Sequence, residues 1–315
     1  MNILTIVNNN RKRITFKFLF LKISIKKNLQ PLWINKIYEY KKAKTPKIIS
    51  CEETLNELIS TGKSLIRYGD GEFNIILGED ISYQEFNIKL QKELKELLLL
   101  HDENLMVGIP NAFADLSQHT DEAQKFWREY MIFNRRFLYK FIDFTRTYYD
   151  SFISRLYIGS LKRKDHLRLF NKVKEIWKNK DIVFIEGKFS RLGYNNDLFS
   201  NAKSIKRIIC PAKNAYSVID KIINNAQKLP ANTLFILALG PTATILGYKL
   251  HQLGYRALDL GHIDIEYEWF LARATHKIPI KNKYVNESVG GDINTPLYDS
   301  KYLNEILVDL SDIKE

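Results

Sequence analysis

From Ile48 onward the chain alternates two kinds of segment: helix-length amphipathic stretches and short runs rich in β-branched and aromatic residues. This alternation is typical of a parallel sheet covered by helices, because parallel strands are joined by long, usually helical crossovers. We therefore predict an α/β fold with an open, mainly parallel sheet and helices on both faces. The expected strands are 64–68, 105–109, 157–158, 181–185, 205–210, 233–239 and 257–260, and the expected helices are 52–60, 84–100, 119–145, 165–177, 214–225 and 242–253.

The net charge of +12 is distributed very unevenly along the 315 residues. Residues 1–50 hold 12 Lys or Arg and a single acid, Glu39, whereas residues 51–315 hold 36 basic and 35 acidic residues. The body of the protein is thus nearly neutral, so we expect no nucleic-acid partner for it. We predict a basic N-terminal extension and linker at 1–47 and one domain at 48–315.

The extension interleaves large apolar residues with lysines at 14–27. Such a segment suits an anionic membrane surface, where apolar side chains enter the interface and lysines meet phosphates; residues 11–47 would make this contact. The alternative is a strand or helix packed on the domain, with its lysines in solvent. Residues 41–47, which include Pro46, are expected to form a linker.

The cellular setting expected from the sequence is the cytoplasm. No apolar run approaches the roughly 18 residues of a membrane-spanning helix, and the first ten residues do not resemble a signal peptide. Cys51 and Cys210 have no neighbours at metal-ligand spacing, which favours a reducing compartment. A peripheral position on the inner face of the cell membrane is consistent with the basic extension.

Residues 67–72 carry two acids, two glycines and an arginine directly after an apolar run. Asp70 and Glu72 form an Asp-x-Glu pattern. In an extended or turning backbone, alternate side chains point the same way, so both carboxylates can hold one divalent cation. A surface turn is the alternative, since Gly-Asp-Gly is common turn composition.

Three further polar loops follow predicted strands, at 187–197, 240–244 and 261–268. Ligands of open parallel sheets bind beyond the carboxyl ends of the strands, so these loops are expected to share one site. In the second loop a helix start offers free N–H groups and the hydroxyls of Thr242 and Thr244 to a phosphate; simple helix capping by threonine is the alternative. The chain has no G-x-G-x-x-G or Walker A motif, which disfavours a dinucleotide dehydrogenase or P-loop kinase.

The 261–268 segment holds four titratable groups: His262, Asp264, Glu266 and Glu268. If a helix begins near Asp264, Asp264 and Glu268 lie one turn apart on one face, and Glu266 points elsewhere. A carboxylate or the imidazole can act as general base towards a sugar hydroxyl, or the acids can simply favour the start of a helix. In the 187–197 loop, Arg191 suits a diphosphate, and a solvated loop is the alternative.

Taken in order, these segments resemble the bacterial GT-D-type glycosyltransferases, which have a Rossmann-like fold. The resemblance implies transfer of a sugar from a nucleoside diphosphate, typically a UDP-sugar, with a divalent metal, Mn²⁺ or Mg²⁺, on the Asp-x-Glu motif formed here by Asp70 and Glu72. The segments that carry the resemblance are 64–78, 107–113, 190–199, 207–216, 237–255, 258–270 and 283–287.

The resemblance also implies roles for other residues. For the catalytic base, Asp264 is our first choice among Asp264, Glu266, His262 and Glu268. Where the family pattern is Leu-Gly-Val-Gly-Asn-Asp, residues 192–197 read Leu-Gly-Tyr-Asn-Asn-Asp, so the shape of this loop or the donor specificity is expected to differ. The expected donor-binding residues are Arg67, Arg191, Asn196, Asp197, Gly240, Thr242 and Thr244, with Arg67 a contact to the donor or a structural partner of the carboxylates.

The expected function is that of a UDP-sugar-dependent hexosyltransferase acting on a hydroxyl of a glycan, glycolipid or glycoprotein, in bacterial surface glycan or glycoprotein assembly. Two other functional classes are alternatives, because they use similar residues. A metal-dependent phosphohydrolase would need the same carboxylates with water as acceptor. A non-catalytic nucleotide-binding protein with a membrane-associating basic tail would bind nucleotide without releasing sugar.

Overall fold

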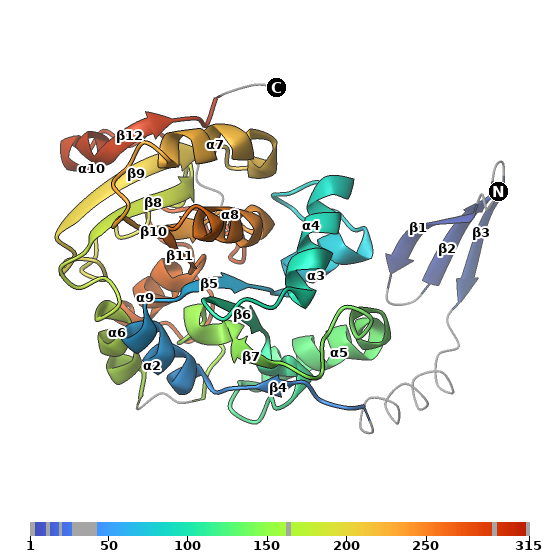
Figure 1. The fold of residues 1–315 in the computed structure, drawn as a ribbon. Coiled ribbons are helices and arrows are strands. Elements are labelled where there is room, and N and C mark those ends of the chain that lie inside the picture. Colours follow the sequence, from blue (N-terminus) through green and yellow to red (C-terminus); the bar gives the residue numbers. More distant parts are fainter. Residues whose placement is uncertain are drawn as a thin grey trace.

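The computed structural model describes residues 4–10, 13–18, 21–26, 43–161, 165–291 and 295–312. Its main body is a nine-stranded sheet in which every strand pair is parallel, in the order β12-β9-β8-β10-β11-β5-β6-β7-β4 (Figure 1). This confirms the predicted open α/β sheet. The strands are β4 (Lys47–Ile48), β5 (Ser64–Arg67), β6 (Leu105–Ile109), β7 (Thr147–Asp150), β8 (Asp181–Gly187), β9 (Ser204–Cys210), β10 (Leu234–Ala238), β11 (Arg256–Asp259) and β12 (Ile306–Asp309).

Helices cover the sheet in two groups (Figure 1). Helix α8 contacts α3, α4 and α7, whereas α2 contacts α6. Short 3₁₀ helices η1 (Asn111–Phe113), η2 (Ser151–Ser154) and η4 (Ala215–Val218) extend three connections. The α-helices are α2 (Cys51–Thr61), α3 (Asp70–Leu77), α4 (Ile88–Leu99), α5 (Asp121–Leu138), α6 (His166–Lys174), α7 (Ile219–Ala226), α8 (Pro241–Gln252), α9 (Ile263–Leu271) and α10 (Ser300–Glu305).

The strands of the sheet centre are apolar on both faces, and successive side chains enter two different core clusters. This is the pattern of a parallel sheet buried on both sides, because neighbouring side chains of a strand point to opposite faces. It also explains why these strands read as continuous apolar runs in the sequence. One cluster takes Ile66, Val107, Val183 and Phe235, and the other takes Leu65, Met106, Ile182 and Leu234.

Capping side chains set several helix starts. The Asn87 side chain accepts hydrogen bonds from the Lys89 and Leu90 N–H groups, so α4 begins at Ile88 and not at the predicted residue 84. Thr120 caps α5 in the same way. Helix α5 ends at Leu138, earlier than the predicted residue 145.

The predicted strand at 157–158 is wrong, and the strand that borders β6 is β7, Thr147–Asp150. The reason is a side-chain acceptor: the N–H groups of Tyr157 and Ile158 donate to the carboxylate of Glu266 instead of a neighbouring strand. The strand at 147–150 is only four residues long, and it lies between the predicted helix 119–145 and the predicted strand 157–158.

The N-terminal residues form a separate antiparallel sheet of three strands, β1 (Leu4–Asn10), β2 (Arg13–Phe18) and β3 (Leu21–Lys26). The chain joins the main domain by residue 44, whose carbonyl accepts a hydrogen bond from the Tyr139 hydroxyl, and β4 then pairs with β7. None of the helices in the described part has both the length and the apolar character needed to cross a bilayer.

Candidate functional site

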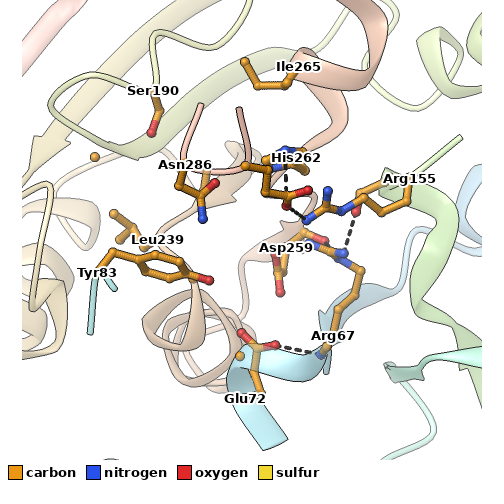
Figure 2. Close-up of a pocket in the computed structure, with 18 of the residues that line it drawn as sticks. Arg67, Glu72, Tyr83, Arg155, Ser190, Leu239, Asp259, His262, Ile265 and Asn286 are labelled. Atoms are coloured by element: carbon orange, nitrogen blue, oxygen red, sulfur yellow. Dashed lines mark hydrogen bonds and ion pairs between the residues drawn. The ribbon is translucent and has the colours of Figure 1, made fainter. Parts of the chain in front are cut away.

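The carboxyl ends of the central strands surround a cavity of about 220 Å³. Strands β8 and β10 are neighbours, but the chain runs from β8 to β9 on one side and from β10 to β11 on the other side. In the same way, the chain runs from β5 to β6, away from β11, the other neighbour of β5. Such divergence opens a crevice between the loops. Figure 2 shows side chains from these loops converging on this cavity.

Asp70 and Glu72 line the cavity from the first turn of α3. The Gly69 N–H donates to Glu72 Oε2 at 2.7 Å, so Glu72 caps its own helix. The backbone is therefore helical here, and the expectation of an extended or turning backbone that aligns the two side chains is wrong. Residues two apart on a helix do not face each other.

Asp70 and Glu72 both have a raised pKa. Burial and the nearby charge of Asp259 raise the pKa of Glu72 to about 7. Burial also raises the pKa of Asp70, and Glu287 adds to the effect while Arg155 opposes it. The hydrogen bonds and ion pairs of the described residues give neither Asp70 nor Glu72 a cationic side chain as partner.

These two carboxylates fit a divalent cation only if other ligands complete its shell. Among the described residues, no group of three or more His, Cys, Asp or Glu is arranged to hold a metal ion. Mg²⁺-type sites commonly use one or two carboxylates and take their remaining ligands from substrate phosphates and water. Half-buried carboxylates that lack a cationic partner among the described residues match that kind of shared site.

Arg67 lines the same cavity, but its guanidinium is occupied by protein acceptors. Its Nη2 lies 2.8 Å from Asp259 Oδ1, and its Nη1 donates to the Ser151 carbonyl at 3.1 Å and to the Ser154 hydroxyl. Arg67 thereby ties together the ends of β5 and β11 and η2. Its partner is Asp259, and not the two carboxylates of α3.

A second ionic cluster lies across the cavity and centres on Glu287. Its Oε1 is 2.5 Å from Arg155 Nη2 and 3.6 Å from His262 Nε2, and its Oε2 is 2.6 Å from Lys277 Nζ. Despite burial, these neighbours hold the pKa of Glu287 well below its usual range. Arg155, His262 and Glu287 all line the cavity (Figure 2 labels the first two).

His262 is neutral at physiological pH. Burial and the positive charge of Arg155 lower its pKa to about 3. Its Nε2 atom is buried without a hydrogen-bond partner in the described part of the chain. Of the four residues expected to be catalytic, His262 is the one that lines the cavity.

Asp264 and Glu268 lie one turn apart on α9, as predicted, but behind the cavity wall. Both accept from Lys283 Nζ at 2.6 Å, and both accept from the Asn196 side chain, at 2.8 and 2.7 Å. Asp264 and Lys283 are fully buried. The cluster joins α9 to the loop after β8 and to the segment around Lys283, and none of its members lines the cavity.

Glu266 is also fully buried and points to another side of α9, as predicted. Its Oε2 accepts the N–H groups of Tyr157 at 2.7 Å and of Ile158 at 2.9 Å. It holds the segment that follows Arg155 against α9, and it does not line the cavity.

The side chains of Arg191 and Asp197 bind other parts of the protein, Arg191 in the interior and Asp197 at the surface. Arg191 has a left-handed backbone (φ 51°), and its guanidinium donates to the carbonyls of Asn282 at 2.8 Å and Thr295 at 2.5 Å. Asp197 accepts from Lys174 Nζ and from the Tyr267 hydroxyl, both at 2.7 Å. The structure thus places both residues outside the cavity lining.

Of the 240–244 motif, only Gly240 lines the cavity. It has φ 54°, and a Cβ atom there would come within 2.4 Å of the Tyr83 ring, so a glycine is needed. The Thr244 hydroxyl donates to the Arg67 carbonyl at 2.9 Å, and the Thr242 hydroxyl faces Gln84. Both threonines are fully buried, away from the lining.

Several lining residues were not among the expected site residues. Two of them had a signal in the sequence. Asp259 is an acid near the end of the predicted strand 257–260, and Glu287 falls in segment 283–287, which carries part of the family resemblance. Arg155 and Tyr83 stand in no recognisable motif, and only the tertiary fold brings them to the cavity.

Comparison with known sequences finds close relatives among glycosyltransferases. Residues 65–288 match the family model for the glycosyltransferase GT-D fold. The chain is 40% identical over 243 residues to the probable glycosyl transferase Gly of Streptococcus gordonii and 38% identical over 237 residues to glycosyltransferase GlyD of Streptococcus pneumoniae. These alignments cover 76% and 75% of this chain but 35% and 29% of the relatives, so the chain spans about a third of their length.

Solved structures agree with the sequence relatives. A glycosyltransferase from Streptococcus sanguinis superposes with a TM-score of 0.79 at 38% identity, over 84% of this chain and 100% of that chain. A highly conserved domain described as having a distinct glycosyltransferase fold superposes with a TM-score of 0.83 at 35% identity, over 88% of this chain and 100% of that chain. The chain therefore belongs to the glycosyltransferase family of the GT-D fold.

Proposed function

We propose that this protein transfers a hexose from a UDP-sugar to a hydroxyl group of an acceptor. The observation that carries the proposal is the pair of half-buried carboxylates, Asp70 and Glu72, which line the cavity at the carboxyl ends of the strands and have no cationic side-chain partner among the described residues. A divalent cation would supply positive charge to these carboxylates, and the nucleoside diphosphate bound to it would fill the crevice where ligands of such sheets bind.

Asp70 and Glu72 would hold the divalent cation, Mn²⁺ or Mg²⁺. When bound, such an ion stabilises negative charge on the phosphate groups of the departing nucleotide. The N-terminus of α8, which reaches the cavity at Gly240, adds positive potential from the helix dipole. Arg67 supports the wall by fixing Asp259, so we assign it a positioning role.

We propose His262 as the group that accepts the proton of the acceptor hydroxyl. Its imidazole lines the cavity, its buried Nε2 atom makes no hydrogen bond within the described residues, and the Glu287 carboxylate, 3.6 Å from Nε2, would stabilise the imidazolium that forms. Asp264 and Glu268 are engaged by Lys283, and Glu266 by two backbone N–H groups, so we assign these three acids to positioning the loops around the cavity.

The acceptor and the setting are further parts of the proposal. The streptococcal relatives are named glycosyltransferases, and we propose a bacterial glycan, glycolipid or glycoprotein acceptor for this chain as well. We also keep the proposal that residues 11–47 meet an anionic membrane surface. Flotation with anionic liposomes tests it: the full chain should float, a chain beginning at Ile48 should not, and equal recovery of both would overturn it.

Release of sugar from a panel of UDP-sugars, measured with and without Mn²⁺, tests the proposed activity. We expect metal-dependent release from one donor, and loss of this release in Asp70→Ala and Glu72→Ala variants that remain folded by circular dichroism. Near-normal release by both variants would overturn the roles of these carboxylates. Turnover of simple phosphate esters, with no release from any nucleotide sugar, would instead identify a phosphohydrolase.

A further inference from the structure

Arg155 is a cation of the cavity, and its side-chain partner within the described residues, Glu287, lies on a loop. It follows η2, lines the cavity and donates from Nη2 to Glu287 Oε1 at 2.5 Å. The charges of Arg155 and Asp70 are close enough for Arg155 to lower the pKa of Asp70. An anion bound to Arg155 would therefore lie beside the proposed cation site of the same cavity.

The loop that carries Glu287 is fixed at its base and exposed at its tip. Its two ends are joined by a hydrogen bond from the Val285 N–H to the Gly291 carbonyl at 2.9 Å, and Lys283 anchors the preceding segment in the buried ionic cluster. At the tip, the Val289 side chain is 99% exposed. Glu287 is thus the ionic tie between this loop and the cavity.

We propose that Arg155 binds the diphosphate of the donor and that the Glu287 carboxylate is an internal competitor, which the diphosphate displaces. This inference rests on the proposed function and adds a residue and a competition to it. A guanidinium offers paired N–H groups that match phosphate and carboxylate oxygens alike, so one anion can replace the other without rebuilding the site.

Lys277 makes the displacement of Glu287 energetically accessible. Its ammonium contacts the other oxygen of Glu287 at 2.6 Å, and its side chain is 41% exposed. If Glu287 leaves Arg155 and moves outward, it therefore keeps one ionic partner near solvent and is not left as an unpaired buried charge. Removing a charged partner without such compensation would be strongly unfavourable.

The proposal predicts which ligands compete with Glu287. Pyrophosphate and UDP carry a diphosphate that reaches both the cation at Asp70 and Glu72 and the guanidinium of Arg155. Uridine has no phosphate, so it has no group that replaces the carboxylate. Selectivity for diphosphates would then arise in part from the competition itself, since only a strong anion displaces Glu287.

Calorimetric titration of the full chain with inorganic pyrophosphate and with UDP, in the presence of Mn²⁺, tests the inference. We expect Glu287→Gln to bind both ligands about tenfold more tightly, because the competing charge is gone, and Arg155→Met to bind them about tenfold more weakly. In the Arg155→Met background, Glu287→Gln should bring no gain, because the site of competition has been removed. Glu52→Gln, which removes the partner of Arg168 on the surface at a similar contact distance, is the matched control and should change neither affinity.

Two results would overturn the inference: weaker or unchanged binding by Glu287→Gln, or an equal gain from Glu287→Gln with and without Arg155. The second result would mean that Glu287 acts only through its general negative charge. Because pyrophosphate contains no sugar, this test is separate from the proposed function. Tighter pyrophosphate binding by Glu287→Gln without turnover of any UDP-sugar would retain the anion site and reject the transferase activity.

Discussion

Two pairs of acids lie on the helices that follow the neighbouring strands β5 and β11, and the two pairs have opposite surroundings. Asp264 and Glu268 on α9 share the buried ammonium of Lys283. Asp70 and Glu72 on α3 face the cavity, and no cationic side chain of the described residues contacts them. The sequence places both pairs after strand ends, but the partner decides the role. An acid paired with a lysine holds the fold together, and a half-buried acid that faces the cavity without such a partner can bind a ligand.

The largest effect on stability is expected from Lys283. Lys283→Met leaves Asp264 and Glu268 without their ammonium, and breaking a buried ion pair in this way costs about 3–5 kcal/mol. We therefore expect urea unfolding at a much lower midpoint, or loss of folded protein. Asp70→Asn, which removes a charge that has no cationic side-chain partner, is the matched comparison and should unfold no more easily than the wild type. Equal destabilisation by the two substitutions would remove the distinction between the pairs.

For activity, we expect the opposite: substitutions of Asp70 and Glu72 should have larger effects than substitutions of the acids that pair with Lys283. Asp70→Asn and Glu72→Gln keep the shape of the cavity but remove its negative charge, and we expect sugar release to fall about 10²–10³-fold, as when one group that stabilises transition-state charge is lost. Steady-state kinetics at saturating Mn²⁺ measures this loss. The distinction fails if a folded Asp264→Asn variant loses more activity than either of them.

A pH-dependent difference is expected at His262. The pKa of His262 is about 3 in the folded protein, against about 6.5 in an unfolded chain, so the unfolded state binds more protons between these values. Stability is therefore lost as the pH falls below 6.5. Relative to His262→Gln, the wild type should lose about 2 kcal/mol of unfolding free energy between pH 7 and pH 5. Urea titrations of both proteins at the two pH values measure it, and parallel losses would contradict the low pKa.

The smallest effect concerns Thr244, which the sequence suggested as a phosphate ligand. Its hydroxyl donates to the Arg67 carbonyl, so Thr244→Val should cost about 1 kcal/mol of stability and leave UDP affinity unchanged. Thermal unfolding and calorimetry on the same sample separate the two outcomes. A clear loss of UDP affinity without loss of stability would contradict this prediction and support a role for Thr244 in donor binding.

The fold was largely predictable because hydrophobic periodicity marks strands and helices directly. Helix boundaries moved where a side chain such as Asn87 caps the backbone. The strand at 147–150 was not predicted because it has only four residues; it lies next to the edge strand β4. Local pattern also cannot show a distant hydrogen-bond acceptor, and the carboxylate of Glu266 is what prevents a strand at 157–158.

The site was predictable only in part, for a related reason. Asp70, Glu72, Arg67, Gly240 and His262 do line the cavity, since they directly follow the ends of central strands. The pairing of Asp264 with Lys283 joins residues that are 19 apart in the chain through tertiary packing, so the sequence does not reveal that Asp264 already has a cationic partner. Arg155 was not predicted as a site residue, because it follows a 3₁₀ helix and belongs to no motif.

The central claim is that Asp70 and Glu72 bind a nucleoside diphosphate through a cation. A thermal-shift experiment with UDP, Mn²⁺ and both together, on the wild type and on Glu72→Gln, tests it most directly. We predict that the wild type is stabilised well beyond the sum of the separate effects when both ligands are present, and that Glu72→Gln loses this excess. Equal stabilisation by UDP with and without Mn²⁺, unchanged in Glu72→Gln, would contradict it.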